Sequence, residues 1–196
     1  VLAIIIGLIC FFVAKNSGEN KMSKVQKLYD NLKNKTSYSF TTTLDENNKL
    51  YYAKLDGKAY TDTIYQGNES KFIIKDGNSY LLADDIKGYY TYTNNEVDLN
   101  KIELALEEIK DESYVEGTEK IENKNYSYEE YNRITGLSIG MTEEEGKEIK
   151  TRFYFKGNKL GYIKTIDGEK QELLKVETSD KVDSNLFEIP SDYKEM

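Results

Sequence analysis

Histidine and tryptophan are absent from this chain of 196 residues, and cysteine and proline occur once each. Without histidine, the chain cannot use Ser-His-Asp or Cys-His catalysis, and it cannot build a histidine-ligated metal site. The single cysteine, Cys10, lies in the apolar N-terminal segment, so the remainder has no disulfide, thiol nucleophile or thiolate ligand. We therefore expect a protein that is not an enzyme and that carries no cofactor.

Acidic residues outnumber basic ones, 35 to 27. The formal net charge is -8 and the sequence pI is about 4.9, and no run of Lys or Arg provides the clustered basic surface that nucleic acid requires. Nucleic acid is therefore excluded as a partner. Hydrophobic residues make up 38% and charged residues 32%, a composition typical of one folded domain rather than a disordered chain.

The longest apolar run occupies residues 1–14, which carry no charge, and a polar linker follows at 15–20. Three interpretations stay open: a transmembrane signal-anchor, a cleaved signal peptide, and a lipoprotein signal acylated at Cys10. The lipoprotein alternative is weakened because Ile9 stands where a small residue is required and because the run continues past Cys10. We expect a single domain over residues 21–196, held on the extracytoplasmic side of the cell membrane by this segment.

Tyrosine-rich segments with alternating polarity follow between residues 36 and 93. Their period of two, interrupted by Asn-Asn, Asp-Gly, Gly-Asn and Lys-Gly turns, predicts an antiparallel meander of six strands. The expected strands cover residues 36–44, 50–55, 60–65, 71–75, 79–83 and 89–92. A polar strand-like run at 119–133 and strands at 151–156, 161–166 and 169–176 extend this sheet.

Two amphipathic helices are predicted beside the sheet. Ser23 and Gln26 form a capping-box pattern before the first helix, which ends at residues 34–35, and Asp98 suits the N-cap of a second helix that ends near residue 111. In the second helix the apolar residues share one face, and the following residues are expected to face water: Glu103, Glu107, Glu108 and Lys110. A loop or short helix is expected at residues 141–146.

The C-terminal sequence Leu186-Phe187-Glu188-Ile189-Pro190, the opening helix VQKLYDNLKN and the first strand TSYSFTTTL together resemble the LolA-like lipoprotein-carrier superfamily, which includes bacterial extracytoplasmic lipoproteins. The resemblance implies an α+β fold: a curved antiparallel sheet, or incomplete β-barrel, with helices packed on its concave face around a hydrophobic cavity. Carriers of this superfamily are soluble shuttles, whereas this chain carries an N-terminal anchor-like segment.

The candidate ligand-binding residues are the aromatic and aliphatic side chains expected to line this cavity. They are Tyr38, Phe40, Tyr52, Tyr60, Phe72, Tyr80, Tyr90, Tyr92, Ile102 and Leu106. The simpler alternative for each tyrosine is a half-buried strand residue without a ligand. The acidic clusters at residues 84–85 and 143–145 lack the spacing of a calcium loop and are expected to be solvated.

Three hypotheses about function follow, of which the third is a hydrolase built on carboxylates alone, which would need two Asp or Glu side chains converging in a cleft. The first is a non-enzymatic, membrane-anchored domain that binds a lipid or another apolar ligand in the half-barrel. The second is a protein–protein interaction or regulatory module of the bacterial cell envelope, presenting a sheet edge or an acidic helix face to a protein partner.

Overall fold

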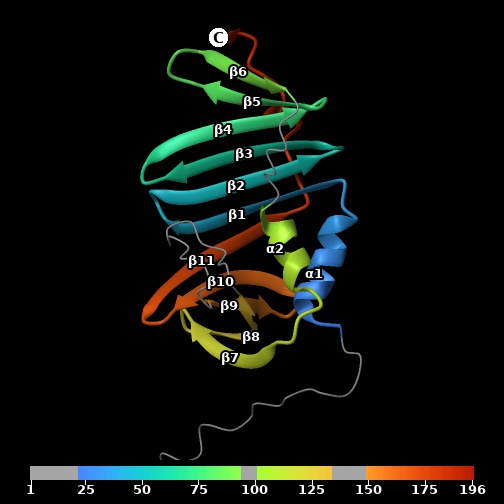
Figure 1. Cartoon of the computed structure of the whole chain (residues 1–196), viewed down its shortest axis with the longest axis vertical. Helices are drawn as coiled ribbons and strands as arrows, with labels where there is room; N and C mark the ends of the chain where they lie inside the picture. Colours follow the sequence, from blue (N-terminus) through green and yellow to red (C-terminus); the bar gives the residue numbers. More distant parts are fainter. Residues whose placement is uncertain (1–21, 94–100, 134–148) are drawn as a thin grey trace, which may run out of the picture.

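A computed structural model describes residues 22–93, 101–133 and 149–196 (Figure 1). These residues form one 12-stranded sheet, two α-helices and a short 3-10 helix. The elements are, in chain order, α1 (Lys24–Lys33), β1 (Ser37–Asp45), β2 (Asn48–Leu55), β3 (Lys58–Tyr65), β4 (Asn68–Lys75), β5 (Asn78–Ala83), β6 (Gly88–Thr93), α2 (Lys101–Ile109), β7 (Val115–Ile121), β8 (Lys124–Arg133), β9 (Ile149–Lys156), β10 (Lys159–Asp167), β11 (Lys170–Ser179), η1 (Ser184–Phe187) and β12 (Lys194–Glu195).

The strand order is β12-β6-β5-β4-β3-β2-β1-β11-β10-β9-β8-β7. All neighbours are antiparallel except β12, which pairs in parallel with β6. The six-stranded meander is confirmed as β1 to β6, and the later strands join it through the pairing of β1 with β11 (Figure 1). The sheet therefore consists of two meanders joined along one seam.

Tight turns set the register of the first meander. The Asp56-Gly57 turn has φ values of 48° and 81°, and Asp76-Gly77 has 55° and 75°. Positive φ at both central residues matches the right-handed twist of a hairpin, and Gly reaches this region without a steric penalty. Two-residue loops of this kind leave no freedom for the strands to slip, so they determine which side chains lie opposite each other.

The first helix begins where the sequence predicts. The Ser23 side chain accepts a hydrogen bond from the Gln26 amide at 2.8 Å. The buried Glu129 carboxylate on β8 adds two more bonds at this terminus, from the amides of Lys24 at 2.7 Å and Val25 at 3.0 Å. A carboxylate stabilises a helix N-terminus through both the free N–H groups and the helix dipole. Glu129 thereby ties α1 to the sheet.

The expectation of an α+β fold with helices packed on the concave face is wrong. The described residues form mostly strands, and the two α-helices have only 10 and 9 residues. Helices of this length are about 15 Å long, whereas twelve strands span about 50 Å, so the helices cannot form a layer over the sheet. They lie side by side beside its middle (Figure 1).

Both faces of the sheet bury apolar side chains. On the helix side, the main core joins α1 and α2 to the two meanders through Leu32, Leu106, Tyr52 and Phe153. On the opposite face, the C-terminal segment around η1 covers β2 to β5, where Phe187 is fully buried. The motif that carries the superfamily resemblance is therefore packed in a second core.

Several predictions fall on residues outside the described ranges. These are the N-terminal segment with Cys10, the Asp98 N-cap, the 141–146 passage and the acidic cluster at 143–145. Among the residues that the structure does describe, no helix is long and apolar enough to cross a membrane.

Candidate functional site

Two rows of directly opposed side chains run across the helix-side face from β1 to β6. Cross-strand pairing fixes both rows, because residues opposite each other in a sheet share a face. Row one consists of Phe40, Tyr52, Thr61, Phe72, Leu81 and Tyr90. Row two consists of Tyr38, Lys54, Ala59, Ile74, Ser79 and Tyr92.

Burial decreases along row one. Phe40 and Tyr52 are each 3% exposed, and their rings stack with centroids 5.1 Å apart. Phe72 and Leu81 are half-buried, and Tyr90 is 39% exposed. Row two ends in the same way, with Tyr92 also 39% exposed. The rows thus begin in the packed core beside the helices and end as an accessible aromatic surface on β6.

The ten predicted site residues divide into groups. Tyr38, Phe40, Tyr52 and Leu106 are buried in the main core, packed against protein side chains. Phe72, Tyr90 and Tyr92 lie on the more exposed part of the same face. Tyr60 and Tyr80 belong to the opposite face, and the Ile102 side chain lies outside the described part of the chain.

Tyr60 and Tyr80 take the opposite face because of the hairpin register. The two-residue turn at 56–57 sets Tyr60 opposite Ala53, and Ala53 points away from its neighbour Tyr52. Tyr80 pairs with Ile73, which pairs with Tyr60, so all three pack beneath the C-terminal segment. The sequence contained this signal, because two-residue turns assign each strand residue to a face.

A polar group lies at the buried end of the rows. The Tyr38 hydroxyl hydrogen-bonds with the Glu103 carboxylate on α2, and the Lys54 ammonium lies 3.6 Å from the same carboxylate. Burial, and secondarily the nearby Glu107 carboxylate, raise the pKa of Glu103 from 4.5 to about 7. The expectation that Glu103 faces water is wrong, since only 14% of its side chain is exposed. Glu107 is exposed as expected and accepts a hydrogen bond from the Tyr29 hydroxyl at 2.8 Å.

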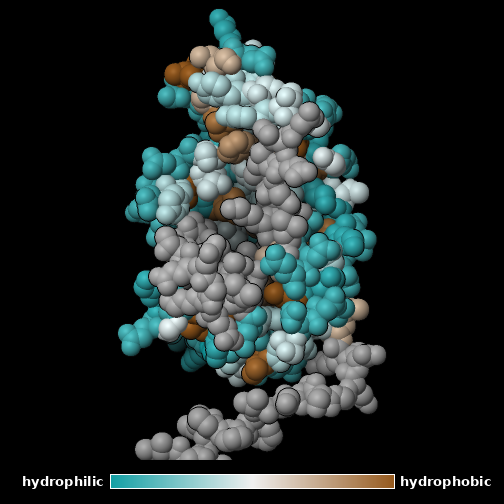
Figure 2. Space-filling model, in the orientation of Figure 1, coloured by the Kyte–Doolittle hydropathy of each residue, from teal (hydrophilic) through white to brown (hydrophobic). Residues whose placement is uncertain are grey.

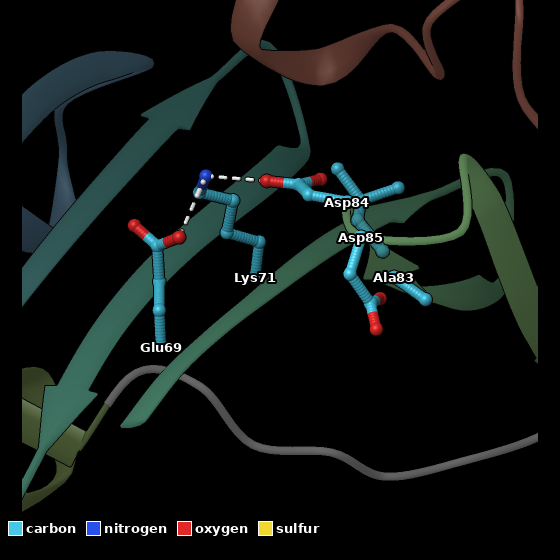
Figure 3. Close-up of a pocket in the computed structure, with 6 residues that line it drawn as sticks. Glu69, Lys71, Ala83, Asp84 and Asp85 are labelled. Carbon is cyan, nitrogen blue, oxygen red and sulfur yellow. Dashed lines mark hydrogen bonds and ion pairs between the residues drawn. The ribbon is translucent and has the colours of Figure 1, made fainter. Parts of the chain in front are cut away.

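A small charged pocket lies at the junction of β4 and β5 (Figure 3). Its volume is about 260 Å³, and its lining residues are Glu69, Lys71, Leu82, Ala83, Asp84 and Asp85. The Lys71 ammonium lies 2.6 Å from Asp84 and 3.1 Å from Glu69, and the Tyr193 hydroxyl donates to Asp84 at 2.7 Å. Lys71 first, and Tyr193 second, hold the pKa of Asp84 below its usual value.

Two of the three carboxylates in this pocket, Glu69 and Asp84, thus share the Lys71 ammonium. Asp84 also accepts a hydrogen bond from Tyr193, and this contact joins the C-terminal segment to the end of the β5 strand. No group of three or more acidic, cysteine or histidine residues suited to a metal ion occurs among the described residues. We therefore take the exposed aromatic end of the rows as the candidate site.

No protein-family model and no curated protein matches the sequence. A comparison with solved structures found chains with a similar backbone fold. An uncharacterised conserved protein of Thermus thermophilus gives a TM-score of 0.48 at 10% identity, with 89% of this chain and 99% of that chain covered. The Mycobacterium tuberculosis lipoprotein LppX gives 0.49 at 12% identity, with 83% and 96% covered. At these values the likeness identifies no family, and function has to be inferred from the chain's own residues.

Proposed function

We propose that this chain is a non-enzymatic domain that binds an apolar ligand, such as a lipid acyl chain, along the exposed end of the two rows. The observation that carries the proposal is the continuity of row one, from the buried pair Phe40 and Tyr52 to the accessible Tyr90. A ligand on Phe72, Leu81 and Tyr90 would extend an existing core rather than start a new one.

Aliphatic side chains enlarge the accessible surface next to Tyr90. A Cβ atom built on Gly88 would come 2.8 Å from Met196 Cγ and 3.5 Å from Ile86 Cδ1. Since Gly88 and Tyr90 are two residues apart in one strand, a Cβ on Gly88 would point to the face on which the Tyr90 side chain lies. Met196 is 63% exposed and Ile86 is 53% exposed. Contiguous exposed apolar surface of this kind marks binding sites more often than chance.

Hydrophobic atoms are visible on this face of the molecule. In Figure 2 hydrophobic residues appear beside and just below the β5–β6 hairpin, while the flanks of the face are largely hydrophilic. Tyrosine suits such a site, because its ring packs against apolar ligands and its hydroxyl tolerates water. Apolar walls with few polar groups are typical of small-molecule sites.

The proposed location is the outer side of the cell membrane, with residues 1–14 as the tether. This placement is supported by the uncharged apolar composition of the segment and by the polar linker that follows. A tethered domain would receive its ligand from the adjacent bilayer, or shield it there, and would not ferry it over a wide gap.

Displacement of Nile red, a neutral apolar dye, by a monoacylglycerol tests the proposal. We expect saturable binding by the wild type and at least about fivefold weaker binding by the double variant Tyr90→Ser/Tyr92→Ser, since two aromatic contacts of about 0.5–1.5 kcal/mol each are lost. The matched control is Tyr65→Ser, which removes a tyrosine that is 42% exposed but lies at the β3–β4 turn. Equal binding by all three proteins would refute the proposed site.

Native mass spectrometry of the purified domain provides a second test. Retained lipid in the wild type, reduced in the double variant, supports ligand binding. A domain that instead elutes with a stoichiometric protein partner, and binds no lipid, would favour the protein–protein hypothesis.

A further inference from the structure

Lys54 is the single charged member of the two rows. It lies on β2, opposite Tyr38 on one side and Ala59 on the other, with a side chain 26% exposed. Its ammonium is 5.8 Å from the centroid of the Tyr38 ring. The other members of its row are uncharged: Tyr38, Ala59, Ile74, Ser79 and Tyr92. An anionic partner would stabilise a mostly buried lysine in this position, because burying an uncompensated charge is costly.

Within the protein, the anionic partner of Lys54 is the Glu103 carboxylate, and the contact between the two groups is long. The distance from Lys54 Nζ to Glu103 Oε1 is 3.6 Å, beyond hydrogen-bond length. Other lysines on the sheet reach their carboxylates directly: Lys71 to Asp84 at 2.6 Å and Lys164 to Glu119 at 2.6 Å. The Lys54 ammonium therefore retains hydrogen-bond donors that Glu103 does not use.

Glu103 is also an incomplete countercharge near neutral pH. The charged and titratable groups that face it are Lys54 from β2, the Tyr38 hydroxyl from β1, and Glu107 from its own helix. Burial and Glu107 raise its pKa to about 7, so a substantial fraction of the carboxyl is protonated and neutral at that pH. In that fraction, Lys54 loses the carboxylate with which it is paired.

We propose that Lys54 binds the anionic head group of an amphiphile whose apolar tail lies along the rows toward Tyr90 and Tyr92. The inference rests on the proposed function and specifies its ligand class. From β2 to β6 the rows cross four inter-strand spacings, about 19 Å, so a long acyl chain can extend from Lys54 to the exposed tyrosines. A phosphate or carboxylate head group then takes the donors that Glu103 leaves free.

Two lipids with the same acyl chain test the inference. Lysophosphatidylglycerol carries a phosphodiester that stays ionised across the neutral range, whereas monoacylglycerol is uncharged. Each is titrated against Nile red with the wild type, Lys54→Met, Glu103→Gln and the control Lys58→Met. Lys58 is an exposed lysine whose ion pair is with Glu188 of the C-terminal segment.

Lys54→Met should weaken lysophosphatidylglycerol binding about tenfold, as expected for one lost charge-assisted hydrogen bond, and should leave monoacylglycerol binding within about twofold. Glu103→Gln should tighten lysophosphatidylglycerol binding, because it removes the competing anion. Wild-type affinity for this lipid should fall as the pH rises from 6 to 8, since Glu103 becomes ionised, and Glu103→Gln should abolish this dependence. Lys58→Met should bind both lipids like the wild type.

These titrations distinguish a failure of the proposed function from a failure of the head-group site. If the wild type binds neither lipid, the proposed function is wrong and the inference falls with it. If both lipids bind and Lys54→Met weakens them equally or not at all, only the head-group site is refuted. Glycerophosphoglycerol, the same head group without the acyl chain and likewise a phosphodiester, should not displace lysophosphatidylglycerol at equal concentration. Equal displacement would show a site for soluble anions and would overturn the amphiphile assignment.

Discussion

Replacing Glu103 with glutamine should stabilise the folded domain at alkaline pH and leave it unchanged at acidic pH. In the native protein the pKa of this carboxyl rises from 4.5 to about 7. Between these values the folded state binds more protons than the unfolded state, so Glu103 makes stability fall as the pH rises through that window. Glutamine has no charge to bury and keeps the size and hydrogen-bonding capacity that Tyr38 requires.

The full cost of ionising such a carboxyl would be about 3 kcal/mol. The side chain keeps some solvent contact and Lys54 lies 3.6 Å away, so we expect only about 1–2 kcal/mol of this to be measurable. Urea unfolding of wild type and Glu103→Gln at pH 5, 6, 7 and 8 measures the difference directly. Comparing the two proteins cancels the contributions of titrating groups that do not interact with Glu103, such as Asp84, whose lowered pKa acts with the opposite sign.

The control for this series is Glu112→Gln, which removes an exposed carboxylate just after α2. Its difference from the wild type should be small and independent of pH. A Glu103→Gln variant that is less stable than the wild type at pH 8, or a difference that does not change with pH, would show that the ionised carboxylate is accommodated without cost.

Three further predictions concern stability and are measured by chemical denaturation at pH 7. Glu129→Ala should cost about 2–4 kcal/mol, because it leaves two amides at the start of α1 without acceptors; a loss under 1 kcal/mol would contradict the role of this side chain. Gly117→Ala should destabilise by about 1–3 kcal/mol, since its Cβ would overlap the Tyr128 ring, and adding Tyr128→Leu should recover most of the loss. Phe187→Ala should cost about 3–5 kcal/mol, because the side chain is fully buried; an unchanged midpoint would show that the C-terminal segment does not need its anchor.

The first meander could be predicted from the sequence because its signals are local. Alternating polarity and turns such as Asp56-Gly57 specify both the strands and their connections within a few residues. The capping of α1 by Ser23 is equally local. By contrast, the part played by Glu129 in the same cap depends on a residue more than a hundred positions away, and no short-range pattern indicates it.

The candidate site could be predicted only in part. Aromatic content indicated a tyrosine-lined wall, and the two-residue turns assign Tyr60 and Tyr80 to the face opposite Tyr52. The sequence did not indicate that the C-terminal segment covers that face. The superfamily resemblance predicted a layer of helices over the concave face of the sheet. In the structure, the C-terminal segment covers the face opposite the helices. The burial of Glu103 could not be predicted from the helical pattern of α2 alone. It depends on Tyr38 and Lys54, which lie on the sheet far from Glu103 in sequence and contact its carboxylate.

The pairing pattern has a consequence for the way the protein folds. The first meander is bordered on one edge by β11 and on the other by β12, so Thr41 pairs with Glu177 and Gly88 pairs with Lys194. Both edges are therefore completed by residues far from them in the sequence. Contacts this far apart in sequence slow folding, because long loops must close before the contacts form. Until then the meander keeps two open edges, which are sites for aggregation. Folding of this domain should therefore be slow, and the unpaired edges of the first meander should be exposed until β11 and β12 have paired with them.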